Sequence, residues 1–125
     1  MRYLIALFIL FSCNNQNVRS DIDIKVDELL SKMTLKEKVG QMTQINLTVI
    51  AKGPTKWESS FPMEIDDKKA NKALVDFKVG SVLNTINNTA QKPSVWFENI
   101  SKIQQISMDG NPLRIPVIYG IDAIH

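Results

Sequence analysis

The sequence of 125 residues has little of several residue types that mark common functional classes. It contains one cysteine, one histidine and five glycines, and only 7% of its residues are aromatic. A single cysteine excludes a disulfide within the chain. We find no glycine-rich phosphate loop, no Cys-x-x-Cys, no His-Glu-x-x-His and no Gly-x-Ser-x-Gly. Without such motifs we expect no metal site. The net charge of +2 gives no basic excess of the kind that favours nucleic acid, so we expect no nucleic-acid partner either.

The longest apolar run lies at the amino terminus and indicates export. Arg2 supplies a positive charge, and residues 3–11 are apolar, which is too short for the roughly twenty residues of a membrane span. We predict a signal peptide over residues 1–12. Cys13 follows Ser12 as in a bacterial lipobox, so we predict lipidation at Cys13; an ordinary secretory signal with a chance cysteine is the alternative. The expected location is the periplasm or an outer-membrane anchor through Cys13, or else the exterior as a secreted protein.

A polar tether, residues 13–22, separates this signal from the globular part of the chain, which starts at residue 23. The tether includes three asparagines and a glutamine within residues 14–17. If the protein is secreted by a eukaryote, three Asn-x-Ser/Thr triplets could carry glycans. They begin at Asn46, Asn87 and Asn99.

Hydrophobic periodicity predicts four helices after the tether. The first has an apolar face from Val26 to Met33, and Thr34 with Glu37 forms a capping box that opens a second, short helix. Residues 52–63 show no period and are predicted to be a surface loop. Asp66 or Asp67 is predicted to cap a third helix, with a carboxylate pair better explained by capping than by catalysis. Its expected inward face consists of Ala70, Ala73, Leu74 and Phe77.

The second half of the chain is typical of an α/β fold. Residues 79–84 and 115–121 are short, apolar segments of the kind found in buried parallel strands. Between them, a helix that begins at Pro93 is predicted to bury one face, so that strand, helix and strand form a βαβ unit. That face consists of Trp96, Ile100, Ile103 and Ser107.

Asp122 is the leading candidate for a functional residue. It directly follows the second strand, and ligands of parallel α/β folds bind at the carboxyl ends of the strands. A carboxylate can accept up to four hydrogen bonds, which suits paired hydroxyls; a helix cap or turn is the alternative. His125 is a weaker candidate, since one histidine makes no metal site. Trp57 and Phe61 could stack on a sugar, although a loop aromatic is more often a hydrophobic plug.

Three segments of the sequence resemble motifs of glycoside hydrolase family 3. Residues 113–125 resemble its Asp-containing strand motif, residues 33–42 its opening helix, and residues 79–84 its first barrel strand. The resemblance implies that residues 23–125 form the amino-terminal part of a (β/α)8 TIM-like barrel, incomplete in this chain. It also implies hydrolysis of terminal, non-reducing β-D-glucosyl or related β-glycosyl residues by a retaining mechanism with two carboxylates and no cofactor.

The same resemblance assigns Asp122 to binding sugar hydroxyls of a β-glucoside or oligosaccharide substrate. The family's nucleophile and acid/base lie further along the chain, so no catalytic residue is expected here, and we expect an amino-terminal fragment. The alternative is a non-enzymatic carbohydrate- or solute-binding lipoprotein, which is also tethered and built from βαβ units. That alternative does not explain why the helix motif and the Asp122 motif occur together.

Overall fold

The computed structural model describes residues 19–55 and 58–122 of the chain. The predictions for the signal peptide, Cys13, Trp57 and His125 therefore lie outside the described residues. Within these two ranges, we find no helix with both the length and the hydropathy of a membrane span.

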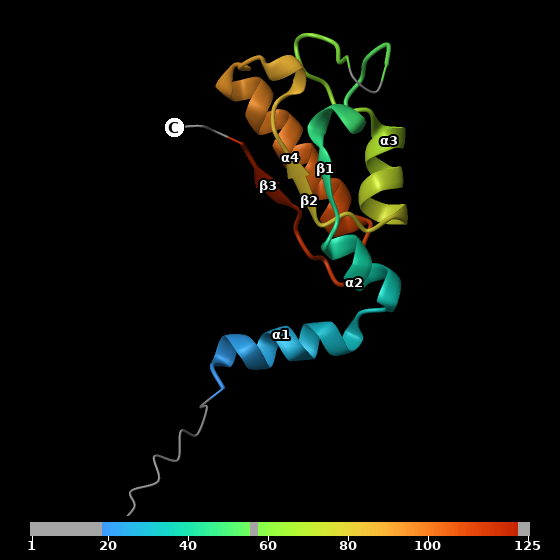
Figure 1. The fold of residues 1–125 in the computed structure, drawn as a ribbon, viewed down its shortest axis with the longest axis vertical. Coiled ribbons are helices and arrows are strands. Elements are labelled where there is room, and N and C mark those ends of the chain that lie inside the picture. Colours follow the sequence, from blue (N-terminus) through green and yellow to red (C-terminus); the bar gives the residue numbers. More distant parts are fainter. Residues whose placement is uncertain (1–18, 56–57, 123–125) are drawn as a thin grey trace, which may run out of the picture.

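A parallel sheet forms the centre of the structure (Figure 1). Its strands, in spatial order, are β1 (Gln44–Asn46), β2 (Ser81–Leu83) and β3 (Ile118–Gly120). β2 and β3 pair in parallel with a helix between them, which confirms the predicted βαβ unit. The sequence predicted only the strands that correspond to β2 and β3, and β1 was not predicted. β1 has only three residues, two of them polar, and so carries a weak pattern.

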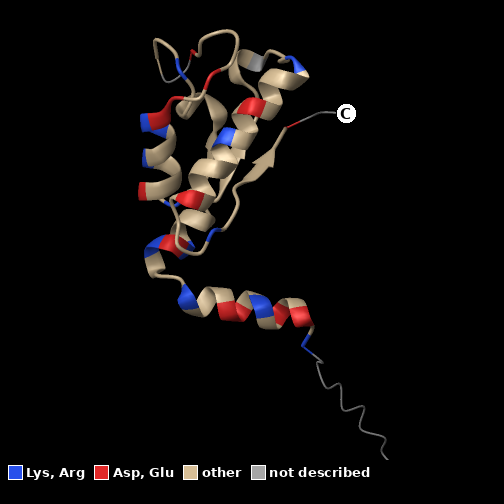
Figure 2. Ribbon diagram, turned by 180° about the vertical axis from the view of Figure 1, so that it is seen from behind, with Lys and Arg blue, Asp and Glu red and all other residues tan. Residues whose placement is uncertain are grey.

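All four predicted helices are present. They are α1 (Asp21–Lys32), α2 (Leu35–Gln41), α3 (Asp67–Asn71) and α4 (Pro93–Asp109). α3 continues as a π-helical turn, Lys72–Asp76, and short 3₁₀ turns occur at Leu47–Val49 and Ile86–Asn88. α3 and α4 pack against the sheet, whereas α1 extends away from it (Figure 1). Charges of both signs are mixed along α1 (Figure 2).

The helix starts follow from local hydrogen bonds. The Glu37 N–H donates to Thr34 Oγ1 at 3.2 Å, and the Thr34 N–H donates to Glu37 Oε2 at 2.8 Å, which confirms the capping box. Asp66 Oδ1 accepts from the Lys69 N–H at 3.0 Å, which confirms the cap of α3. A second box, Ser20 with Asp23, opens α1 and was missed from the sequence.

Because of these two caps, the free energy of unfolding should depend on pH in the acidic range. The backbone N–H of Thr34 lowers the pKa of Glu37, and that of Lys69 lowers the pKa of Asp66. A carboxyl whose pKa is lowered by folding stabilises the fold above its unfolded pKa, and this contribution is lost as the pH falls through the folded value. We therefore expect the free energy of unfolding to decrease below a pH of about 4, measured by urea denaturation at several pH values. Glu37→Gln should weaken this dependence; an unchanged pH profile in that variant contradicts the assignment.

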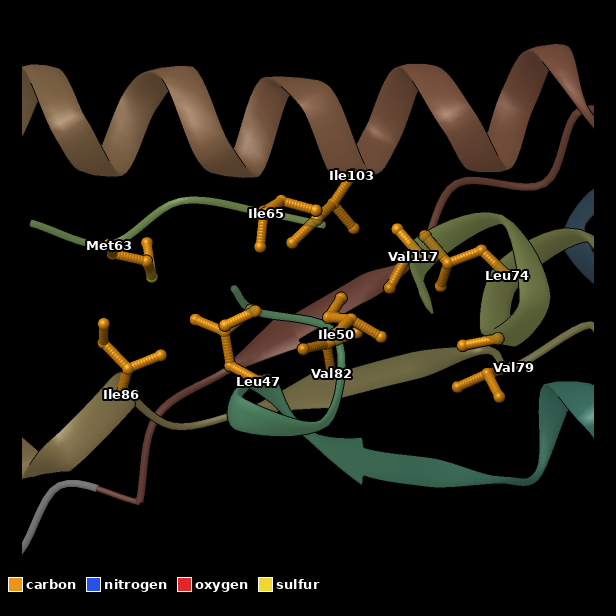
Figure 3. Packing of buried hydrophobic residues seen from close by; sticks show 13 residues of the cluster. Leu47, Ile50, Met63, Ile65, Leu74, Val79, Val82, Ile86, Ile103 and Val117 are labelled. Atoms are coloured by element: carbon orange, nitrogen blue, oxygen red, sulfur yellow. The ribbon is translucent and has the colours of Figure 1, made fainter. Parts of the chain in front are cut away.

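The hydrophobic core lies between the sheet and the helices α3 and α4 (Figure 3). The register aligns Ile45, Val82 and Tyr119 across the sheet, and because side chains alternate along a strand, these three share one face. Val82 lies in one buried cluster with Leu74 of the π turn and Ile103 of α4. Both helices therefore cover the same face of the sheet.

Two sequence predictions of burial are wrong. Phe77 is 56% exposed, because the Phe77 N–H donates to the Lys72 carbonyl in a π turn that rotates it off the Ala70–Leu74 face. Strand 115–121 is not buried on both faces, since Ile118 is 71% exposed. The apolar face of α1 is mixed: Val26 and Leu30 are exposed, Leu29 is half-buried, and Met33, directly after the helix, is buried.

The segment predicted as a surface loop is partly core, because side-chain amides hold it. Asn99, buried on α4, accepts from the Ile65 N–H at 2.9 Å and donates to the Met63 carbonyl at 3.0 Å. Gln91 Oε1 accepts from the Met63 N–H at 3.1 Å, and the Met63 side chain is buried. The Asn99 amide nitrogen is thus occupied inside the protein, so the folded chain cannot carry a glycan there.

Two glycines bring the end of α2 against the start of β2. The Gly80 N–H donates to the Gly40 carbonyl at 2.9 Å. A Cβ atom at Gly40 would lie 2.4 Å from the Lys78 carbonyl oxygen and 2.5 Å from that of Phe77. Both neighbours are backbone atoms and cannot move aside cheaply.

We therefore expect Gly40→Ala to lower the free energy of unfolding by about 1–3 kcal/mol, the usual cost of overpacking. Urea denaturation followed by tryptophan fluorescence measures this loss. Gly120→Ala is the matched control, because its Cβ would meet only Leu83 Cδ1 at an ordinary 3.5 Å. Equal effects of the two substitutions would contradict the packing argument.

Candidate functional site

The carboxyl ends of the three strands meet at one edge of the sheet. Asn46 ends β1, Asn84 directly follows β2, and Asp122 lies two residues beyond β3. The register pairs Asn46 with Leu83 and Leu83 with Gly120, so the three strands end level with one another. We call Asn46, Asn84 and Asp122 the strand-end edge.

Asn84 joins the ends of β2 and β3. Its N–H donates to the Gly120 carbonyl at 2.9 Å, and its Oδ1 accepts from the Asp122 N–H at 2.8 Å. Its carbonyl oxygen accepts from the Tyr119 hydroxyl at 3.1 Å. The backbone of Asn84 has a φ of 68°, in the left-handed region where asparagine is enriched. The sequence predicts Asn84 at the end of strand 79–84 but does not reveal this role.

Tyr119 anchors the edge to the core. Its ring meets Trp96 of α4 edge to face, with centroids 5.3 Å apart and planes at 66°. Burial raises the pKa of Tyr119 to about 12, so its hydroxyl stays protonated and can donate to Asn84 at neutral pH. Trp96, predicted to be core, is half-buried and packs against the core.

Asn46 turns the chain at the end of β1. Its Oδ1 accepts from the Thr48 N–H at 3.0 Å and from the Thr48 hydroxyl at 2.8 Å. This caps the 3₁₀ turn Leu47–Val49, in which Leu47 enters the core. The exposed Asn46 side chain thus has a structural explanation, and its place on the strand-end edge was not predicted.

The structure places Asp122 where the sequence predicted it, at the carboxyl end of β3. Its backbone is held by Asn84, and the residue is exposed. In the part of the chain that the structure describes, no ion pair involves the Asp122 carboxylate. A fixed backbone and an exposed carboxylate allow Asp122 to accept hydrogen bonds from the hydroxyls of a ligand.

Phe61 is the one further sugar-binding candidate among the described residues. Phe61 is 66% exposed in the loop before α3, and no aromatic contact is found for it among the described rings. Between residues 19 and 122, apart from the undescribed pair 56–57, no group of three or more His, Cys, Asp or Glu residues could hold a metal ion.

Comparison with known proteins finds a relative among the β-glucosidases. A curated relative, the "Lysosomal beta glucosidase" of Dictyostelium discoideum, is 34% identical over 123 residues. The alignment covers 89% of this chain but only 14% of the relative. No family model matches the chain. The chain is thus similar to one segment of a β-glucosidase and spans about a seventh of its length.

Proposed function

We propose that the chain is the amino-terminal part of a (β/α)8 barrel in a longer enzyme of glycoside hydrolase family 3. The structure supports this with a parallel sheet whose helices α3 and α4 share one face. On the other face, Ile118 is 71% exposed. Parallel sheets are normally covered on both faces, and in a closed barrel the second face is filled by the remaining strands.

The proposed reaction is hydrolysis of terminal, non-reducing β-D-glucosyl or related β-glycosyl residues. One observation carries it: Asp122 stands at the carboxyl end of a parallel strand, in a chain 34% identical to part of a β-glucosidase. In this reading the Asp122 carboxylate accepts hydrogen bonds from hydroxyls of the sugar whose bond is cleaved.

The chemical steps belong to groups outside this chain. A retaining glycosidase needs two carboxyl groups about 5–5.5 Å apart. One attacks the anomeric carbon while the other protonates the leaving oxygen, and water then releases the sugar from the first. Asp122 contributes by orienting the ring, so its hydrogen bonds should strengthen as the ring flattens in the transition state. This mechanism requires no metal or organic cofactor.

The test is an assay of the longer enzyme that contains this chain. We expect it to hydrolyse p-nitrophenyl β-D-glucoside and not the α-anomer. Proton NMR of the first product should show the β-anomer, since retention preserves configuration. Absence of β-glycosidase activity in a folded enzyme, or an inverted first product, would reject the proposed function or its mechanism, respectively.

We further propose that the protein is exported, with residues 1–12 as the signal peptide. The lysosomal relative supports an enzyme that leaves the cytosol. For a lipid anchor at Cys13, labelled palmitate should enter the protein expressed in a bacterial host. Cys13→Ala should abolish the label, and Asn14→Ala should retain it. A mature protein cleaved elsewhere and without label indicates an ordinary secretory signal.

A further inference from the structure

We infer that Asn84 is a positioning residue that fixes Asp122 for sugar binding; this rests on the proposed function. Asp122 lies beyond the last residue of β3, where the sheet's own hydrogen bonds no longer hold the chain. Beyond the sheet, the Asp122 N–H donates to Asn84 Oδ1 at 2.8 Å, and this hydrogen bond holds the chain there. Asn84 therefore decides where the backbone of Asp122 lies.

Asn84 is itself held from two directions. Its N–H continues the ladder to Gly120, and its carbonyl oxygen accepts from the Tyr119 hydroxyl. Tyr119 packs edge to face on Trp96 of α4. A continuous set of contacts thus runs from α4 through Tyr119 and Asn84 to Asp122.

The residue type at position 84 fits this role. A φ of 68° disfavours most side chains, and only asparagine, aspartate and glycine adopt it readily. Of these, glycine lacks the side-chain oxygen that Asp122 needs. Asparagine provides that oxygen without a second negative charge beside the Asp122 carboxylate. Asparagine therefore satisfies both requirements of position 84, the left-handed backbone conformation and the side-chain acceptor.

The Asn84→Gly substitution separates positioning from folding. Glycine keeps the backbone conformation, so the thermal midpoint of the longer enzyme should change little. Small displacements of a binding group can cost up to a hundredfold in rate, and we expect kcat/KM for an aryl β-glucoside to fall about tenfold. Thr89→Ala, an exposed change in the following loop, is the control and should leave kcat/KM unchanged.

A double substitution tests whether Asn84 acts through Asp122. In an Asp122→Ala enzyme, the Asn84→Gly change should cost less than twofold, since the group it positions is gone. Hydrogen exchange by mass spectrometry should show a protected Asp122 amide in the wild type and in Asn84→Asp, which keeps an oxygen acceptor. That protection should be lost in Asn84→Gly.

The outcomes separate this inference from the proposed function. An inactive wild type rejects the proposed function and the inference with it. An active wild type that loses activity with Asp122→Ala but not with Asn84→Gly overturns the inference alone. Additive losses in the double variant, or an unprotected Asp122 amide in the wild type, also overturn it.

Discussion

Asn99→Ala is expected to cost about 2–6 kcal/mol of unfolding free energy. The substitution leaves the Ile65 N–H and the Met63 carbonyl inside the protein without the partners that Asn99 gives them. Each buried backbone group left unpaired costs about 1–3 kcal/mol. Since small domains have only 5–15 kcal/mol of stability in total, this loss should be visible as a large fall in the urea midpoint.

The control for this prediction is Gln105→Ala on the same helix. Gln105 is exposed, so its replacement should change the free energy of unfolding by no more than about 0.5 kcal/mol. If Asn99→Ala behaves like this control, the amide does not hold the segment that contains Met63 and Ile65. Because the Asn99 amide nitrogen is hydrogen-bonded inside the protein, we also expect glycan analysis to find no glycan at Asn99 in folded protein.

Asp122→Ala should lower kcat/KM of the longer enzyme about ten- to a hundredfold. A hydrogen bond to a charged group contributes about 1.5–3 kcal/mol, and about 1.4 kcal/mol corresponds to a factor of ten in rate. Part of the loss should appear in kcat, because the ring flattens on the way to the oxocarbenium-like transition state. Steady-state kinetics with an aryl β-glucoside measure both constants.

Three variants refine this prediction. Asp122→Asn keeps the size and one acceptor oxygen, so its kcat/KM should lie between those of the wild type and Asp122→Ala. His125→Ala should reduce kcat/KM less than Asp122→Ala does. Asp76→Ala is the matched control, since this exposed carboxylate precedes β2 at the opposite end of the sheet. Near wild-type kinetics for Asp122→Ala in a folded enzyme would show that Asp122 is only a turn residue.

The features that the sequence predicted correctly are those set by neighbouring residues. The caps at Thr34 and Asp66 depend on partners three residues away, and the start of α4 depends on Pro93. The position of Asp122 was also predictable, because it follows from the end of one apolar strand. In each case the information lies within a few residues of the structure it specifies.

The features that were missed depend on distant partners. β1 exists because Gln44–Asn46 pairs with β2, and three residues carry too little pattern to show this. Met63 is buried because amides from Gln91 and Asn99 satisfy the backbone around it. The role of Asn84 depends on Asp122. A single sequence does not reveal such pairs, although an asparagine directly after a buried strand is a usable signal.

The register of the sheet also bears on how the chain is made. Gln44 pairs with Ser81 and Ser81 with Ile118, a separation of 37 residues in each case. At about 5–20 residues per second, a ribosome needs roughly 2–7 s to deliver each partner strand. In the first interval both backbone edges of β1 are unpaired, and in the second one edge of β2 is unpaired. Leu47 and Ile50 lack the core that buries them until the later segments arrive. Synthesis speed and chaperone access should therefore influence the yield of folded protein more than they do for a helical bundle of the same size.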